Sequence, residues 1–180
     1  MRVLVACEYS GTVRDAFERT GHSAISCDLL PSAGNHYQGD VRDILSDGWD
    51  LMVAHPPCTY LAVCGARYFK GREREQSEAL SFVRLLLNAP IEQIALENPV
   101  SVISTQVRKP DQIVQPWMFG HGESKKKCLW LKNLPLLKPT KIVVGREQRI
   151  LNMAPSPDRG KKRSLFYTGI ADAMATQWTR

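Results

Sequence analysis

The 180 residues are 43% hydrophobic and 23% charged, proportions that are ordinary for a globular protein and exclude a disordered or fibrous class. The length fits one domain, and no apolar run approaches the roughly 18 residues needed to span a bilayer, which argues against a membrane protein. The net charge of +6 is concentrated in residues 101–180, where 15 Lys and Arg face 5 Asp and Glu, and this basic half favours nucleic acid as a partner.

Residues 1–100 alternate between strand and helix patterns. Short apolar runs rich in β-branched residues predict strands over residues 2–7, 23–27, 49–54 and 94–96. Apolar side chains at helical spacing predict helices over residues 12–20 and 73–88. This alternation predicts a doubly wound, mostly parallel α/β sheet with helices on both faces.

The second half of the chain is less regular. Residues 112–117 are rich in turn formers, and residues 128–131 and 141–144 are apolar runs that predict strands. Residues 152–162 carry two prolines and a glycine and predict an exposed loop, whereas residues 169–178 predict a terminal helix. Without a linker or a repeat, residues 1–180 are expected to form one domain, with a cofactor and catalytic core in 1–100.

Polar residues follow each predicted strand of the first half. They are Glu8 to Gly11, Asp28, Asp40, Pro56 to Cys58, and Glu97 with Asn98. Ligands of open α/β sheets bind beyond the carboxyl ends of the strands, near a switch point in strand order. We therefore expect these segments to meet at one ligand-binding edge.

Cys58 and Glu97 are the candidate catalytic pair. Most cysteines are inert and buried, but Cys58 follows two prolines at a strand end, where a rigid turn would present its thiol to a ligand. Glu97 ends the next strand, and Asn98 could hold it in place. A thiolate beside a carboxylic acid suits nucleophilic attack on an electron-poor heterocycle whose ring nitrogen the acid assists.

Residues 50–58 resemble the Pro-Cys nucleophile motif of DNA cytosine-C5 methyltransferases, and residues 95–98 resemble the Glu-Asn motif of the same family. The resemblance covers residues 1–100 best, and residues 163–178 resemble the family's C-terminal segment, which packs back beside the cofactor. It implies a Rossmann-like methyltransferase fold that uses S-adenosylmethionine (SAM). The cofactor-binding residues that it implies are Glu8, Tyr9, Ser10, Gly11, Asp28, Leu29, Asp40, Val41 and Pro56.

The resemblance also implies a mechanism. Cys58 attacks C6 of cytosine, Glu97 assists at N3, C5 takes the methyl group from SAM, and loss of the C5 proton expels the cysteine. Double-stranded DNA is the expected substrate, and its target base must first leave the stack. The substrate-binding residues are expected to be Pro57, Asn98, Lys125, Lys126, Lys127 and Arg163.

Three departures from the family pattern affect these expectations. The first turn keeps Gly11 as its single glycine, and the family's Gln-x-Arg-x-Arg motif has no clean copy, so a lysine among Lys125 to Lys127 is expected to supply its positive charge. Only about 30 residues separate Leu131 from Arg163, too few for the family's large base-recognition region. Sequence recognition must then be reduced, borrowed from another protein or performed by a homodimer.

Other functions fit parts of the pattern. The segment His55 to Tyr60 also resembles the Asp/Asn-Pro-Pro-aromatic motif of amino methyltransferases, which needs no cysteine. A nucleic-acid-binding homologue without turnover, or a C5 pyrimidine-modifying enzyme acting on RNA or a nucleotide, would also explain the altered motifs. The pair of Cys58 and Glu97 favours the DNA methyltransferase over these alternatives.

The five cysteines bear on location and on metal binding. They are odd in number, never spaced as C-x-x-C and mostly set in apolar stretches, which disfavours a disulfide framework and a zinc site. No metal site is expected. The start of the chain lacks the apolar region of a signal peptide, so a cytoplasmic location is expected, in a bacterium or a phage-infected host.

Overall fold

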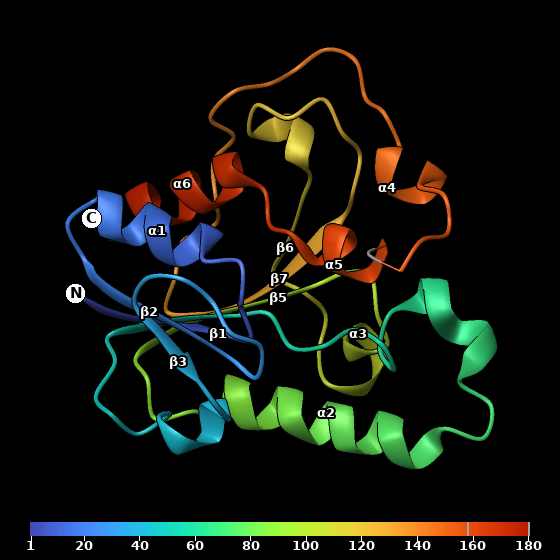
Figure 1. Ribbon diagram of the computed structural model, residues 1–180, viewed down its shortest axis with the longest axis horizontal. Helices are drawn as coiled ribbons and strands as arrows, with labels where there is room; N and C mark the ends of the chain where they lie inside the picture. The colour runs from blue at the N-terminus through green and yellow to red at the C-terminus, as the bar shows by residue number, and fades with distance from the viewer. Residues whose placement is uncertain (158, 180) are drawn as a thin grey trace.

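The computed structural model describes residues 1–157 and 159–179 as an α/β fold built on a seven-stranded mixed sheet (Figure 1). The strand order is β3-β2-β1-β4-β5-β7-β6. The strands are β1 Arg2–Ala6, β2 Ser23–Asp28, β3 His36–Gln38, β4 Leu51–Ala54, β5 Gln93–Asn98, β6 Gln112–Val114 and β7 Lys127–Lys132.

Strands β1 to β5 pair in parallel, whereas β7 lies antiparallel between β5 and β6. The parallel strands therefore all end at the same edge of the sheet. Because β7 runs the opposite way, its amino end lies at that edge, beside the carboxyl end of β5. Segments from both halves of the chain thus meet at one place.

Helices cover both faces of the sheet. Figure 1 shows α1 and α6 side by side on one face and α2 on the other. The α-helices are α1 Thr12–Arg19, α2 Glu73–Leu87, α3 Ile103–Gln106, α4 Arg149–Asn152, α5 Arg159–Ser164 and α6 Thr168–Gln177. Short 3-10 helices lie at η1 Val41–Asp43, η2 Val63–Tyr68 and η3 Pro116–Met118.

The protein has two hydrophobic cores, one on each face of the sheet, because successive side chains of the central strands point to opposite faces. In β1, Val3 and Val5 pack toward α1 and α6, whereas Leu4 and Ala6 pack toward α2. All four side chains are fully buried, which is why the strand is a continuous apolar run. Removing a side chain such as Phe17 of α1 from water contributes about 1.5–3 kcal/mol.

The second half of the chain differs from the sequence-based expectation in three places. Residues 141–144 were expected to form a strand, but Lys141 forms only a single bridge with Phe119, and Val144 is almost fully exposed. The predicted strand is wrong because its residues lie where the fold provides no neighbouring strand to pair with. Residues 112–117 include β6 rather than turns alone, and the expected loop over 152–162 gives way to α5 at its end.

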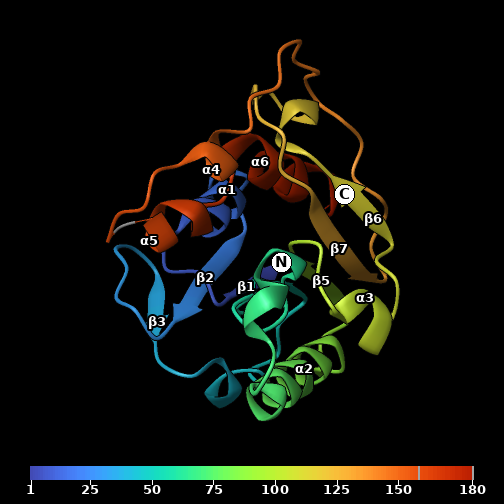
Figure 2. The same ribbon diagram turned by 90° about the vertical axis from the view of Figure 1, so that its right-hand side faces the viewer.

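Figure 2 looks onto the edge where the parallel strands end, with α5 on one side and α3 on the other. None of the helices in the described ranges is both long and apolar enough to cross a membrane. The expected strands and helices of residues 1–100 are present, and β3 is an additional strand that was not predicted.

Candidate active site

The strand register brings Glu97 and His55 together. Val53 of β4 lies opposite Ala95 of β5, so two residues further on His55 lies beside Glu97, on the face covered by α1 and α6. On the other side of β5, Leu129 lies opposite Glu97. Lys127 is two residues away from Leu129 and therefore on the same face, within reach of Glu97.

Both oxygens of Glu97 accept hydrogen bonds in this arrangement. Lys127 Nζ lies 2.9 Å from Oε1, and His55 Nδ1 donates to Oε2 over 3.2 Å. The side chains of Glu97 and Lys127 are 8% and 5% exposed, so this is a buried ion pair. Burial disfavours the charge of Glu97, but the ammonium of Lys127 and the hydrogen bond from His55 outweigh it and lower its pKa to about 2. Glu97 is therefore a carboxylate at neutral pH.

Aromatic rings cover this buried ion pair. The ring of Phe166 lies 4.7 Å from that of His55, and Lys127 Nζ lies 4.3 Å from the centre of the Phe166 ring. Tyr167 lies next to it, with its centre 6.0 Å from the same ammonium. Cation–π attraction and exclusion of water by these rings both favour the charged pair.

A cavity of about 960 Å³ opens at the carboxyl ends of the parallel strands. Its wall combines strand ends of the first half with the basic segments of the second. Sequence-predicted residues in the wall are Glu8, Tyr9, Ser10, Asp28, Pro56, Pro57, Cys58, Glu97, Asn98, Lys125, Lys126, Lys127 and Arg163. The structure thus brings most of the predicted site residues to one cavity.

Cys58 lies in the turn that follows β4 and is exposed. Its carbonyl oxygen accepts hydrogen bonds from the backbone of Leu61 and Ala62, and Asn98 Nδ2 donates to the carbonyl oxygen of Pro56 over 2.9 Å. These contacts hold the turn against the end of β5. Partial burial raises the pKa of the Cys58 thiol, Glu97 adds to this effect, and Lys125 opposes it.

Two buried polar atoms in the cavity wall have no hydrogen-bond partner among the described residues. They are Nε2 of His55 and Oδ1 of Asn98. Buried polar atoms are almost always hydrogen-bonded in folded proteins, because an unmade bond costs about 1–3 kcal/mol. These two unpaired atoms therefore lie just beneath the cavity wall, in residues that line it.

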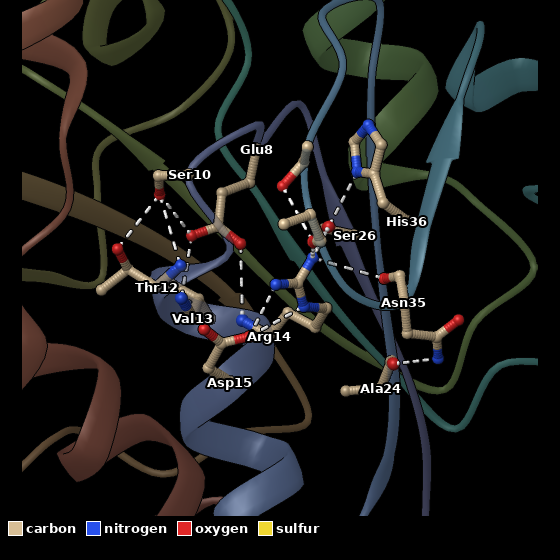
Figure 3. Close-up of polar contacts among 12 residues, drawn as sticks. Glu8, Ser10, Thr12, Val13, Arg14, Asp15, Ala24, Ser26, Asn35 and His36 are labelled. Atoms are coloured by element: carbon tan, nitrogen blue, oxygen red, sulfur yellow. Dashed lines mark hydrogen bonds and ion pairs between the residues drawn. The ribbon is translucent and has the colours of Figure 1, made fainter.

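The first turn of the chain is held by Glu8 (Figure 3). The carboxylate of this 5% exposed residue accepts hydrogen bonds from the backbone N–H of Val13 over 2.8 Å and of Arg14 over 3.4 Å. Ser10 Oγ donates to the same carboxylate over 3.0 Å. Glu8 thus fills the anion-binding position at the amino end of α1 with the protein's own negative charge.

Arg14 of α1 connects this helix to β2, as Figure 3 shows. Its guanidinium is buried, pairs with Asp15 over 2.7 Å, and donates to Ser26 Oγ over 2.9 Å. Glycine is required beside it, since a Cβ atom at Gly11 would lie 2.3 Å from the guanidinium and Gly11 has a φ of 73°. The single glycine of the first turn therefore serves Arg14 packing and the entry to α1.

The basic side of the cavity is formed by the segment before β7 and by α5. Lys125 Nζ donates to the carbonyl oxygen of Arg163 over 2.8 Å, which joins the two segments. Burial lowers the pKa of Lys125 to about 8, and the charges of Lys127 and Arg163 act in the same direction. The three consecutive lysines therefore differ in exposure: Lys125 is half-buried, Lys126 is exposed and Lys127 is buried.

Four predicted cofactor residues are not in the cavity wall. Gly11 and Val41 are buried elsewhere, and Leu29 is 73% exposed. Asp40 accepts a hydrogen bond from the backbone N–H of Arg42 and forms an ion pair with its guanidinium. These residues shape the segments around the site rather than line it.

Several wall residues were not predicted as part of the site. They include His55, Cys64 and Phe166. His55 and Glu97 each directly follow a predicted strand, 49–54 and 94–96, and this was the signal that could have paired them. No group of residues suited to hold a metal ion occurs within the described part of the chain.

Comparison with models of known protein families gives no match, and a search of curated protein sequences also gives none.

Proposed function

We propose that this protein is a SAM-dependent methyltransferase that transfers a methyl group to C5 of cytosine in DNA. The observation that carries the proposal is the presence of Cys58 and Glu97 in one cavity, at the ends of two neighbouring parallel strands. A nucleophile beside a fixed acidic group is the arrangement that attack on a pyrimidine ring requires. The resemblance of residues 50–58 and 95–98 to the family motifs supports the same assignment.

The fold is compatible with this function. Strands β3-β2-β1-β4-β5 have the order found in Rossmann-like sheets, whose ligands bind where the strand order reverses. In this chain that position lies at the ends of β1 and β4, which carry Glu8 and Cys58 beyond them. We infer a doubly wound methyltransferase arrangement from this order and from the helices on both faces.

The charge of the first turn favours SAM over a dinucleotide. Dinucleotides place their pyrophosphate at the amino end of the first helix, where Glu8 already accepts the backbone N–H groups and would repel a phosphate. SAM instead carries a positive sulfonium and an ammonium group, which an acidic turn attracts. Glu8, Tyr9, Ser10, Asp28 and Pro56 would hold it. When bound, SAM supplies the methyl group.

The residues of the cavity then have defined roles. The thiolate of Cys58 forms a bond to C6, and the ring electrons move to C5, which becomes nucleophilic. Glu97 is held as a carboxylate, so it accepts the exocyclic N4–H of cytosine, and a proton reaches N3 from Lys127 or His55. After methylation, the C5 proton leaves to solvent and the N3 proton returns to the group that supplied it. The ring double bond is restored as the C6–S bond breaks, which releases the Cys58 thiolate.

DNA binding is supported by the charge distribution. Lys126, Arg163 and Lys162 lie on or beside the cavity wall in the half of the chain that carries most of the positive charge. Contacts from such residues to phosphates would offset the few kcal/mol that it costs to unstack a base. Because too few residues separate Leu131 from Arg163 for a large base-recognition region, the proposal also covers recognition assisted by a second copy of the chain.

A covalent trap tests the proposal directly. DNA that contains 5-fluorocytosine cannot lose a proton from C5, so the bond between Cys58 and C6 should persist after methyl transfer. We expect a denaturation-resistant adduct with the wild-type protein and SAM, and none with Cys58→Ser. The matched control is Cys64→Ser, which changes the other exposed cysteine of the wall and should still form the adduct.

Three outcomes would each contradict a different part of the proposal. Methylation of DNA that survives Cys58→Ser would indicate an amino methyltransferase, which needs no cysteine. An adduct with a 5-fluorinated nucleotide or RNA but not with DNA would keep the chemistry and replace the substrate. Absence of any SAM binding at millimolar concentration would indicate a binding protein without turnover.

A further inference from the structure

Lys125 lies in the wall of the same cavity as Cys58 but makes different contacts from Lys127. Lys127 is 4% exposed and paired with Glu97, so its charge is neutralised. Lys125 donates to the carbonyl oxygen of Arg163, a neutral acceptor, and no ion pair of Lys125 occurs among the residues that the structure describes. It is therefore free to respond to a charge that forms in the cavity.

The other basic groups near Cys58 are less accessible from the cavity. His55 uses Nδ1 to donate to Glu97, and its Nε2 has no hydrogen-bond partner but is buried away from solvent. Lys127 is held by Glu97 and by the ring of Phe166. Lys125 instead stands before the start of β7, at the end of the sheet where the Cys58 turn projects.

We propose that Lys125 is the group that accepts the proton of the Cys58 thiol when this cysteine becomes a nucleophile. The S–H bond breaks as an N–H bond forms on the neutral amine, which leaves a thiolate beside an ammonium ion. The inference rests on the proposed role of Cys58 and names the base that this role requires. The carbonyl oxygen of Arg163 would accept one N–H of the new ammonium and keep it in place.

Electrostatics at the site agree with this role. Burial lowers the pKa of Lys125 to about 8, so a substantial fraction is a neutral amine near that pH. Lys125 faces the charges of Lys127, Glu97 and Arg163 as well as Cys58, whereas the Cys58 thiol faces Glu97, Cys64 and Lys125. The two groups therefore influence one another, and each favours the charged form of the other.

Alkylation of Cys58 by iodoacetamide tests the inference on the free protein, with the modified peptide quantified by mass spectrometry. Only the thiolate reacts. Lys125→Met should therefore slow alkylation at pH 8 by about threefold to tenfold, because a pKa raised by one unit lowers the thiolate fraction tenfold. Lys109→Met removes the same charge from an exposed position outside the cavity wall and should change the rate less than twofold.

The variant Lys125→Arg keeps the positive charge near Cys58 but cannot give up a proton and so cannot become a neutral base. Arginine stays protonated at every pH used, so alkylation of Cys58 at pH 8 should be as fast as in the wild type or faster. The pH profile gives a further readout that a structural role would not change. In the wild type, loss of the Lys125 charge near pH 8 should make the alkylation profile shallower than a one-proton curve, and Lys125→Arg should restore that curve.

Unchanged alkylation in Lys125→Met, or a one-proton profile in the wild type, would overturn the inference. Alkylation of Lys125→Arg that is as slow as that of Lys125→Met would also overturn it, because the positive charge at this position would then have no effect on the Cys58 thiol. A wild-type protein that forms no adduct while its alkylation profile has the predicted shallow form would refute the proposed function and leave the coupling of Lys125 to Cys58 standing.

Discussion

The buried ion pair between Glu97 and Lys127 is the feature on which most of the site geometry depends. Lys127→Met removes the ammonium and leaves the carboxylate buried without its charged partner. Breaking such a pair typically costs about 3–5 kcal/mol, so we expect this loss in the free energy of unfolding measured by urea titration. The control is Lys126→Met, an exposed neighbour whose loss should cost less than about 0.5 kcal/mol. Equal stability of the two variants would contradict the burial described.

Glu97 also predicts how stability depends on pH. Its pKa is lowered from 4.5 to about 2, so its stabilising effect is fully present above the unfolded-state pKa and is lost as pH falls toward 2. The shift corresponds to about 3 kcal/mol. The stability difference between the wild type and Glu97→Gln should therefore shrink between about pH 5 and pH 2.5, as followed by chemical denaturation. A constant difference across this range would indicate that Glu97 is not charged in the folded protein.

The sequence predicted Cys58 and Glu97 because Glu97 directly follows an apolar run and Cys58 lies in the proline turn after another, and both positions are visible in the sequence. It did not predict that Lys127 would pair with Glu97, because this depends on β7 running antiparallel to β5. The capping of α1 by Glu8 was also missed, since an acidic residue in a turn can serve a ligand or a helix equally well. The pattern of apolar runs in the sequence thus identified the site residues. The antiparallel pairing of β7 with β5, which the sequence does not show, determines that Glu97 is paired with Lys127.

At the scale of elements, the docking of α6 depends on Gly169. A Cβ atom there would lie 1.9 Å from the carbonyl oxygen of Phe119, a backbone atom that cannot easily move. Gly169→Ala should therefore lower the free energy of unfolding by about 1–3 kcal/mol or more, measured by urea titration. In Gly122→Ala the nearest atom would be 3.5 Å away, an ordinary contact, so that variant should stay within about 1 kcal/mol of the wild type. If both variants unfold alike, α6 is not packed as described.

Strands in the middle of the sheet could be predicted from the sequence, whereas segments at its edges could not. The strands over 49–54 and 94–96 were expected, because strands buried on both faces of a sheet form continuous apolar runs. The helix over 73–88 was expected from the helical spacing of its apolar side chains. Residues 141–144 have the composition of a strand but lie where no neighbour completes the pairing. In contrast, β3 is short and polar, and it forms because β2 offers an edge for it.

At the scale of the whole molecule, the division of charge predicts a salt-dependent interaction with DNA. Replacing one lysine that contacts a phosphate should reduce the slope of log affinity against log salt by about one. We expect this for Lys126→Met, measured by fluorescence anisotropy with duplex DNA between about 50 and 200 mM salt. Lys109→Met, which lies outside the cavity wall, should keep the wild-type slope. The same reduction in both variants would mean that binding is not centred on the cavity.

The α/β class and the convergence of polar strand ends could be predicted from the sequence, because both follow from the order of apolar runs. The inserted antiparallel strand could not, since nothing in residues 127–132 encodes the direction in which they pair. That strand places Lys127 at the end of β5, where its ammonium pairs with Glu97.

Nucleoside analysis by mass spectrometry tests the central claim most directly. DNA incubated with the protein and SAM is digested to nucleosides, so that the modified base and the added group are identified together. Our account predicts 5-methylcytosine with the wild type and none with Cys58→Ser. Methylation of an exocyclic amino group, or unmodified DNA from a folded protein that binds SAM, would contradict it.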